Sequence, residues 1–417
     1  MTSKLYDAVV IGGGPAGSTT AAVLAAKGRR VLILEREKFP RYHIGESLMP
    51  YCYFPLERLG VIDRMKTSHF PKKYSVQFVN IDGHASHPFY FFQHLQHEAS
   101  TTWQVLRSEF DQMLLDNARA RGAEVLEETM VRDTIKQNGV VVGVKAVGKD
   151  GEAQEFHAPI TIDASGRDAL VLARNGWKVR DPYLNKIAIW TYYKGALRDP
   201  GLDEGATTVA YLPEKGWFWY IPLPEDTVSV GVVAEKTYLY RNSRDLAAIF
   251  QSEVVNNAWI QRHLASGRQT GQYWVTAEYS YRSRHCAVDG LILVGDAFAF
   301  LDPVFSSGVF LALRSGEIAA DAVDRALASG DVSASQFSDY GDELCKGIEA
   351  MRKLIYAFYD HEFSFREFVN EFPHLKGDLT DCLIGNLFRE FQPLFDGLAE
   401  FAKLPEPLAL GKPLSER

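Results

Sequence analysis

Two tryptophans stand one residue apart in the hexapeptide WFWYIP, residues 217–222. Side chains alternate between the two faces of an extended strand, so Trp217 and Trp219 are expected to project from the same face. A pair of this kind usually belongs to a hydrophobic core, and it can also form the wall of a passage beside a cofactor. Two glycine-containing motifs and one lysine elsewhere in the chain favour the second interpretation.

A glycine-rich motif near the N-terminus predicts a dinucleotide site. GGGPAG, residues 12–17, follows an apolar run that begins at Tyr6 and precedes small residues at helical spacing. Glycines permit a tight turn and a close approach of the backbone, while the helix N-terminus faces the pyrophosphate. Glu35, about 20 residues further on, is placed to accept hydrogen bonds from the adenosine ribose. The expected cofactor-binding positions here are Gly12, Gly14, Ala16, Gly17 and Glu35.

A second motif favours FAD over NAD as the dinucleotide. The apolar run 291–294 leads into Gly295 and Asp296, and an aspartate at such a strand end suits a contact with the ribityl or pyrophosphate part of FAD. DASGR, residues 163–167, has the pattern of another strand end over the same cofactor. We therefore expect Asp163, Gly295 and Asp296 near FAD.

The elements that must position these residues indicate an α/β fold. The opening of the chain reads as a βαβ unit, because a glycine-rich turn joins a buried strand to a helix and a second buried strand follows. The expected strands are 6–11, 31–35, 76–92, 103–106, 291–294 and several within 124–162 and 186–233. The expected helices are 15–27, 108–121, 243–267, the residues after Gly308 and nearly everything from Ser335 onward.

The motifs are spread so widely that the cofactor domain must be discontinuous. We expect a Rossmann-like FAD-binding domain interleaved with a β-sheet substrate domain, followed by a C-terminal helical region. The expected boundaries are 1–75, 100–180 and 276–345 for the FAD domain, 76–99 and 181–275 for the sheet domain, and 346–417 for the helical cap.

Composition excludes several functional classes. The 417-residue chain is 46% hydrophobic and carries a formal net charge of −8, which argues against a general nucleic-acid binder. Its four cysteines are scattered without CxxC spacing, so neither a disulfide framework nor a zinc site is expected, and no metal is. No apolar run approaches the ~20 residues that span a membrane, and the N-terminus lacks the pattern of a signal peptide. The sequence therefore predicts a soluble cytoplasmic protein without a membrane partner.

From Tyr6 to about Ala312 the chain resembles the flavin-dependent halogenases, within the larger group of FAD enzymes with the p-hydroxybenzoate hydroxylase fold. Of the shared motifs, WFWYIP is the one associated with halogenases. The resemblance implies that reduced FAD and oxygen give a C4a-hydroperoxide, that chloride or bromide attacks its distal oxygen, and that hypohalous acid travels through a tunnel to the substrate. It rests on GGGPAG, FPRYHIGESLMP (39–50), FPKKYSVQF (70–78), DASGR, WFWYIP and GDAFAFLDPVFSSGV (295–309).

The resemblance assigns roles to individual residues. Lys73 matches the family lysine that holds hypohalous acid, although Ser75 and Val76 replace the small Gly-Ala pair of the family pattern. Lys72 is expected to point to the other side of the extended segment. Further expectations are Ser307 and Gly308 for halide, Trp217 and Trp219 as the barrier between flavin and substrate, Glu46 as a tunnel-lining carboxylate, and Arg41, Ser47, Arg107 and Pro303 as additional flavin contacts.

Phe305 bears on the acceptor. Free-tryptophan halogenases carry a glutamate at this position, and an apolar ring cannot act as a base, so free tryptophan is disfavoured. The PVFSSG form is similar to that of enzymes acting on phenols or pyrroles, free or tethered to a carrier protein, and most similar to pyrrolyl carrier-protein halogenases. A separate flavin reductase would supply reduced FAD. Two alternatives remain open: a flavin monooxygenase or geranylgeranyl-type reductase without halide, and a flavoprotein that keeps FAD as a structural or sensing module.

Overall fold

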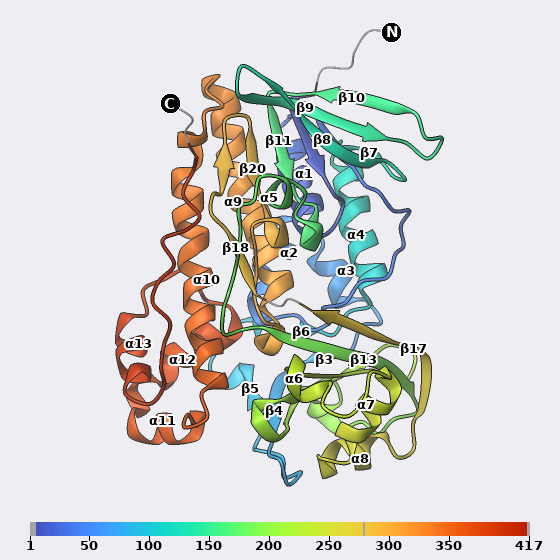
Figure 1. The fold of residues 1–417 in the computed structure, drawn as a ribbon, viewed down its shortest axis with the longest axis vertical. Helices are drawn as coiled ribbons and strands as arrows, with labels where there is room; N and C mark the ends of the chain where they lie inside the picture. Colours follow the sequence, from blue (N-terminus) through green and yellow to red (C-terminus); the bar gives the residue numbers. More distant parts are fainter. Residues whose placement is uncertain (1–5, 278–279, 415–417) are drawn as a thin grey trace.

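The computed structural model describes residues 6–277 and 280–414 and is built around two sheets (Figure 1). The first has six strands in the order β19-β20-β11-β1-β2-β7. Strands β1, β2 and β11 are buried along their whole length, as expected for parallel strands covered on both faces. The bounds are β1 Ala8–Ile11, β2 Val31–Leu34, β7 Glu124–Leu126, β11 Ile160–Asp163, β19 Ala287–Val288 and β20 Leu291–Leu293.

Helix α1, Pro15–Ala26, joins the parallel strands β1 and β2, which confirms the expected βαβ opening. Gly12 has a φ of +98°, and a Cβ there would lie 2.5 Å from the carbonyl oxygen of Ala164. A Cβ on Gly17 would lie only 2.0 Å from the carbonyl oxygen of Gly12. Both glycines are therefore required for α1 to begin this close to the strand ends. Helices α4, Arg107–Ala120, and α9, Ser307–Ser329, pack against α1.

The second sheet has seven strands in the order β17-β13-β16-β15-β14-β4-β5 and occupies the lower part of Figure 1. One face packs toward the first sheet and the other is covered by short helices. The strands are β4 Ser75–Val79, β5 Phe89–Tyr90, β13 Lys186–Lys194, β14 Thr207–Tyr211, β15 Trp217–Leu223, β16 Thr227–Glu235 and β17 Arg268–Ala277. The covering helices are α6 Lys236–Leu239, α7 Leu246–Val254 and α8 Ala258–Leu264.

Strand β15 divides its aromatic side chains as the alternation predicts. Trp217 and Trp219 belong to the core shared with the first sheet, whereas Phe218 and Tyr220 pack under the covering helices. Gly231 of β16 pairs with Trp219 of β15, and a Cβ at Gly231 would lie 2.2 Å from the Trp219 ring. The absence of that side chain gives the indole its place over the neighbouring strand.

Smaller helices and strands surround the two sheets. The helices are α2 Tyr53–Arg58, α3 Ile62–Lys66 and α5 Leu170–Arg174. The strands are β3 Lys72–Lys73, β6 Thr102–Trp103, β8 Met130–Gln137, β9 Val140–Val147, β10 Ala153–His157, β12 Lys178–Arg180, β18 Tyr281–Ser283 and β21 Ala299–Phe300. Expectation and structure differ at 243–267, because α7 and α8 are separate helices: Asn257 caps the second by accepting the N–H groups of Trp259 and Ile260.

The C-terminal helices lie beside both sheets, at the left of Figure 1. They are α10 Ser338–Tyr359, α11 Phe365–Glu371, α12 Lys376–Ile384 and α13 Gln392–Ala399. After α13 the chain is extended and returns to the first sheet, where Leu414 donates its N–H to Ala287. No helix within residues 6–277 and 280–414 is long and apolar enough to cross a membrane. The domain boundaries expected from the sequence stay a prediction.

Candidate active site

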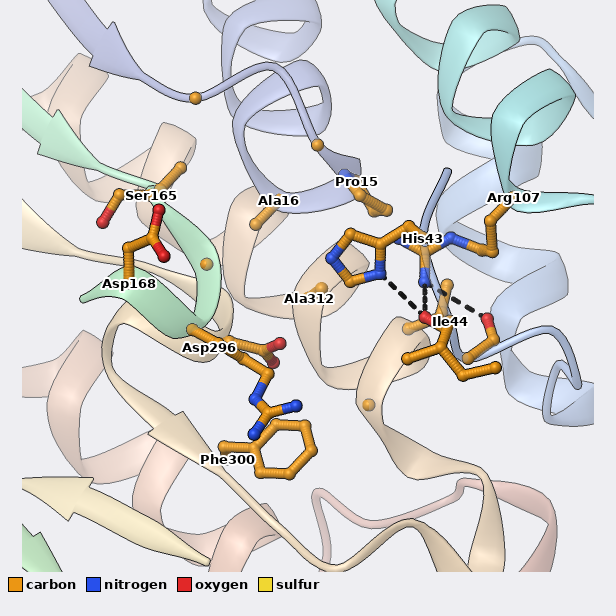
Figure 2. Close-up of a pocket in the computed structure, with 18 of the residues that line it drawn as sticks. Pro15, Ala16, His43, Ile44, Arg107, Ser165, Asp168, Asp296, Phe300 and Ala312 are labelled. Atoms are coloured by element: carbon orange, nitrogen blue, oxygen red, sulfur yellow. Dashed lines mark hydrogen bonds between the residues drawn. The ribbon is translucent and has the colours of Figure 1, made fainter. Parts of the chain in front are cut away.

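A cavity of about 440 Å³ lies between the carboxyl ends of the parallel strands and the tryptophan face of the large sheet. The β1–α1 turn, the end of β2 and the loop after β11 line one end, and Trp217 and Trp219 line the other. Figure 2 shows Pro15 and Ala16 at the start of α1, with His43 and Arg107 on one side of the cavity and Ser165, Asp168 and Asp296 on the other. The carboxyl ends of parallel strands are the usual place for a bound dinucleotide.

The N-terminus of α1 faces this cavity without a side-chain cap. Gly14 is the N-cap residue and Pro15 follows it. Glu35 accepts the Gly13 N–H through Oε2 at 2.7 Å and the Glu37 N–H through Oε1 at 2.8 Å. Its carboxylate therefore holds the glycine turn in shape while also lining the cavity. The contact of Glu35 with a ribose stays a prediction.

Arg107 braces the loop that carries the next group of site residues. Its guanidinium forms a two-point ion pair with the buried Asp111, at 2.8 and 3.0 Å. The same guanidinium donates to the carbonyl oxygens of Ile44 at 2.6 Å and Gly45 at 3.2 Å. Arg41 lies 3.2 Å from Asp111 and also lines the cavity. The two arginines thus share one carboxylate, which leaves net positive charge at this wall.

The structure does not bring every expected flavin contact to the cavity surface. Asp163 is buried beneath it, where Oδ1 accepts the Ser165 N–H at 3.0 Å and Oδ2 accepts the Val171 N–H at 2.9 Å. Its role is to shape the DASGR turn, whose other residues line the cavity. Gly17 and Gly295 likewise lie under the surface, since a Cβ on Gly295 would approach the Ala16 Cβ to 2.8 Å.

Asp296 reaches the cavity from the end of β20. The side chain is partly buried, and loss of hydration raises the pKa of its carboxyl to about 6, against the opposing charges of Arg167 and Arg107. Pro303 lines the cavity from the following loop. Both residues line the cavity in which FAD is expected, and their contacts with it stay predictions.

The loop before α9 has the features of an anion site. Asp302 accepts the Val304 N–H at 3.1 Å, and Ser306 takes a left-handed conformation with a φ of +58°. The 23-residue helix α9 then begins at Ser307 with its first-turn N–H groups directed back toward the loop. The Ser307 hydroxyl is buried and has no hydrogen-bond partner among the described residues. A Cβ on Gly308 would meet no described atom within 4 Å, so the cavity reaches this backbone.

The tryptophan wall is tied to this loop. The Trp217 and Trp219 rings lie 6.2 Å apart between centroids, and the Trp190 ring lies 6.3 Å from that of Trp219. The Trp217 indole donates to the Tyr359 hydroxyl at 2.7 Å, and that hydroxyl donates to Asp302 Oδ2 at 2.9 Å. Burial raises the pKa of the Asp302 carboxyl to about 6. Helix α10 therefore links the aromatic wall to the loop before α9.

Lys73 lines a second cavity of about 370 Å³. Its side chain is 2% exposed, whereas Lys72 is exposed, as the strand alternation predicts. The Lys73 amine donates to the Ser47 hydroxyl at 2.9 Å and to the Leu48 carbonyl at 3.1 Å. Burial lowers the pKa of this amine to about 7. Phe305 lines the same cavity.

The two cavities adjoin at a shared wall. Thr207, Val304 and Ser306 line both of them. Ser47 lines the first cavity, and its hydroxyl lies 2.9 Å from the Lys73 amine and 2.7 Å from the Thr207 hydroxyl. Lys73 thus lies on the far side of this wall from the tryptophan pair, close to the loop that precedes α9.

Sequence reasoning missed several residues of the site. His43 lines the first cavity, and burial followed by the charge of Arg107 lowers the pKa of its imidazole to about 4. Trp190 could have been found from the alternation of β13, which puts it on the face of the tryptophan pair. Thr207 and Tyr359 carry no sequence signal, because only the packing of β14 and α10 brings them to the site.

These residues fit bound FAD and a halide. The uncapped N-terminus of α1 and the cationic wall of Arg41 and Arg107 suit a pyrophosphate. The open backbone at Gly308 leaves room for an adjacent ring or anion, whereas the unpartnered Ser307 hydroxyl is buried next to it and lines neither cavity. The individual contacts stay predictions.

Comparison with known proteins shows the family. The family model described as tryptophan halogenase matches residues 7–103 and 92–366. The 1H-pyrrole-2-carbonyl-(peptidyl-carrier protein) chlorinase of Pseudomonas fluorescens is 32% identical over 413 residues, covering 93% of this chain and 91% of that protein. The corresponding brominase of Pseudoalteromonas luteoviolacea is 33% identical over 388 residues, covering 92% and 93%.

Solved structures agree with these matches. The flavin-dependent brominase Bmp2 superposes with a TM-score of 0.87 at 30% identity, covering 95% of this chain and 98% of that one. The myxobacterial chondrochloren halogenase CndH superposes with a TM-score of 0.81 at 31% identity, covering 98% and 99%. The chain therefore belongs to the tryptophan halogenase family and is a flavin-dependent halogenase, an oxidoreductase that uses FAD and a halide.

Proposed function

We propose that the enzyme halogenates a pyrrole ring carried as an acyl group by a peptidyl carrier protein. The observation that carries this proposal is the second cavity, which joins Lys73 to an apolar aromatic pocket beside the loop before α9. Two relatives that match over nine-tenths of the chain are named for a pyrrole-2-carbonyl group on a carrier protein. An electron-rich five-membered ring is the size of acceptor that such a pocket can enclose.

The first cavity holds the cofactor in this proposal. Its contacts with FAD would come from the α1 N-terminus, Glu35, Arg41, Arg107 and Asp296, while Ser307 and Gly308 would hold the halide at the start of α9. When bound, reduced FAD supplies the two electrons with which oxygen becomes able to oxidise the halide. In this proposal the wall shared by the two cavities, with Thr207, Val304 and Ser306, separates that cofactor from the acceptor, and the tryptophans close the flavin side. The product leaving the first cavity is then hypohalous acid.

Lys73 receives the hypohalous acid. Near its pKa of about 7 the amine is present in both forms. The ammonium form can donate a hydrogen bond to hypohalous acid, and the neutral amine can exchange one N–H bond for an N–halogen bond with release of water. The Ser47 hydroxyl and the Leu48 carbonyl accept hydrogen bonds from this amine and fix its direction. Both forms place the halogen at the inner end of the second cavity.

The lining of the second cavity suits an aromatic acyl group at the end of a flexible arm. Its apolar lining includes five phenylalanines, namely Phe78, Phe89, Phe91, Phe305 and Phe365. Arg366 and Lys376 line the same cavity, are exposed, and form no ion pair with any described residue. A carrier protein presents its acyl group on a phosphopantetheine arm, and these two cations are placed to attract the phosphate of that arm.

We also propose that a separate flavin reductase delivers the reduced cofactor. The chain carries one glycine-rich dinucleotide motif, residues 12–17, and FAD is expected there. A nicotinamide nucleotide would then bind and react on another protein.

The decisive experiment supplies chemically reduced FAD, oxygen and chloride or bromide to the purified enzyme. Parallel reactions contain pyrrole-2-carbonyl on a carrier protein, free pyrrole-2-carboxylate and an activated phenol, and mass spectrometry follows the products. Halogenation of the carrier-bound pyrrole above both free acceptors is the expected result. Hydroxylated or unchanged acceptors while the flavin is oxidised would contradict halogen transfer to these acceptors. A preference for the free phenol would contradict only the proposal that the acceptor is carrier-bound, and not halogen transfer itself.

A further inference from the structure

A row of hydrogen-bonded hydroxyl groups, here called the hydroxyl relay, leads from the protein surface to a buried carboxyl in the first cavity. Tyr42 is 45% exposed, and its hydroxyl lies 2.9 Å from that of Tyr192. The Tyr192 hydroxyl donates to Glu46 Oε1 at 2.8 Å. Glu46 is 3% exposed and lines the first cavity together with Trp219. The hydroxyl relay therefore connects solvent with the flavin side of the tryptophan wall.

The hydrogen bonds of the hydroxyl relay show in which direction its protons point. The Trp190 indole donates to the Tyr42 oxygen at 2.7 Å, which leaves the Tyr42 proton free to point toward Tyr192. The Tyr192 proton points in turn toward Glu46. Burial raises the pKa of both phenols, so both protons are present at neutral pH. Every hydroxyl proton in the hydroxyl relay can thus point inward.

The inner end of the hydroxyl relay is the second carboxyl oxygen of Glu46, Oε2, which is free to react. None of the described residues gives Glu46 Oε2 a hydrogen bond of ordinary geometry. Burial raises the pKa of this carboxyl to about 7, while the nearby Ser229 hydroxyl, the Tyr192 hydroxyl and the charge of Arg107 lower it in part. An unpartnered oxygen of this kind is costly in a purely structural carboxyl.

Halide oxidation requires a proton at this place. With X⁻ for the halide, the balanced reaction is FADH2 + O2 + X⁻ + H⁺ → FAD + HOX + H2O. Oxygen receives two electrons from the flavin and two from the halide, and its atoms leave as HOX and water. The proton on the left must come from solvent, and Glu46 is a buried carboxyl that lines the cavity where it is needed.

We propose that Tyr42, Tyr192 and Glu46 form the path that delivers this proton. Glu46 gives up the proton on Oε2 to the cavity, Tyr192 passes its hydroxyl proton to Oε1, Tyr42 passes its own to Tyr192, and solvent replaces it. Each O–H bond that breaks is matched by one that forms, and rotation of the carboxyl returns its proton to the cavity side. The proposal rests on the oxidation of halide with FAD and is independent of the acceptor.

The charged and titratable groups facing Glu46 come from three elements. Tyr42 and Tyr192 supply the phenols, from the loop after β2 and from β13. Arg107 at the start of α4 supplies the positive charge, and it shares the Asp111 carboxylate with Arg41. Of these groups, Tyr192 is the one that hydrogen-bonds to Glu46 directly.

The first test uses the protein without its cofactor. Infrared difference spectroscopy between acid and alkaline pH should show the C=O stretch of a protonated carboxyl that titrates with a midpoint near 7. Glu46→Gln should abolish this band, and Tyr192→Phe should move it to higher frequency because one hydrogen bond to the carboxyl is lost. Absence of any titrating band that depends on Glu46 would overturn the proposal.

The second test measures formation of HOX in a single turnover. Photoreduced FAD, oxygen and bromide are mixed with enzyme saturated in flavin, and a diffusible dye traps HOX without an acceptor protein. Tyr192→Phe and Glu46→Gln should slow HOX formation by roughly 100-fold or more, since a positioned acid typically contributes about 10²- to 10⁴-fold. The wild-type rate should show a solvent deuterium isotope effect. The limb that falls above about pH 7 should disappear in Glu46→Gln and move to higher pH in Tyr192→Phe, where the carboxyl loses the hydrogen bond that lowers its pKa.

Tyr193→Phe is the matched control, because the Tyr193 hydroxyl belongs to the same strand but contacts Gln251 on the opposite face. It should leave the rate and isotope effect unchanged. Tyr42→Phe provides an exposed variant that tests the path even where Tyr192→Phe binds FAD poorly, and it too should slow HOX formation. Normal rates and isotope effects in Tyr42→Phe and Tyr192→Phe at every pH would overturn the relay.

Discussion

The hydroxyl of Tyr359 donates to the carboxylate of Asp302 at 2.9 Å and so fixes the loop before α9 from outside the flavin cavity. The same hydroxyl accepts the Trp217 indole N–H at 2.7 Å. One side chain of helix α10 therefore holds both the halide loop and the aromatic wall. A shift of α10 would move the two together, which keeps the passage between them constant.

Tyr359→Phe should loosen both sides of this passage. The buried Trp217 N–H and one Asp302 oxygen lose their partner, so the free energy of unfolding should fall by about 1 to 3 kcal/mol. A larger share of the reduced flavin should then be oxidised without halogenation, because the barrier no longer holds its position. Denaturant unfolding and the ratio of hydrogen peroxide to halogenated product measure the two effects.

Tyr356→Phe is the control for this change. Tyr356 lies on the same helix and donates to Asp181 at 2.6 Å, away from the wall. Its loss should lower stability by a similar amount without changing the ratio of peroxide to product. Equal ratios in both variants and in the wild type would contradict a role of Tyr359 in holding the wall.

Lys73→Met should abolish transfer of halogen while halide oxidation continues. The substitution keeps a linear apolar side chain of similar length in a buried site but removes the amine. Product should fall by at least about 100-fold, since HOX is no longer held against the acceptor. Trapped HOX and oxidised flavin should stay near wild-type amounts. Lys72→Met, on the exposed face of the same strand, should change neither quantity, and substantial product from Lys73→Met would remove this residue from the mechanism.

Glu46 should make the stability of the folded protein depend on pH. Its pKa is about 7 in the folded protein and 4.5 without the fold, so the folded state binds more protons between these values. Stability must then decrease as pH rises through this window. Glu46→Gln removes the titration and should exceed the wild type by up to about 3 kcal/mol above pH 7, with the difference disappearing toward pH 4. A constant difference between the two proteins across this range would contradict the raised pKa.

The parts of the fold that the sequence could predict depend on local pattern. The β1–α1–β2 unit follows from GGGPAG between two buried runs, and the common face of Trp217 and Trp219 follows from strand alternation. The break between α7 and α8 was missed because Asn257 is an ordinary polar residue in the pattern, and its capping role depends on the chain turning there.

The rest of the site depends on contacts between distant segments. Tyr359 lies 57 residues from Asp302, and Tyr192 lies 146 residues from Glu46. No periodicity within either segment reports that these side chains meet. Asp163 was expected at the flavin because its turn has a suitable pattern, but the backbone N–H groups of that turn occupy its carboxylate.

Arg366 and Lys376 offer a prediction that separates the carrier-bound acceptor from a free one. Replacing both by alanine removes two exposed cations of the second cavity that have no carboxylate partner among the described residues. The KM for carrier-bound pyrrole should rise roughly tenfold, equivalent to one charge-assisted hydrogen bond, while kcat and the KM for a free phenol stay constant. The wild-type KM should increase with salt, and the double variant should be less sensitive, because screening acts on the phosphate contact.

Lys403→Ala is the control for this effect. Lys403 is exposed in the same C-terminal region but does not line the second cavity. If it raises the KM as much as the double variant does, the cations act only through the overall charge of this face. If neither variant changes the KM for carrier-bound substrate, the arm enters elsewhere. We expect an effect confined to Arg366 and Lys376. A cation that lies farther from the bound phosphate than about a Debye length of 8 to 10 Å is largely screened from it.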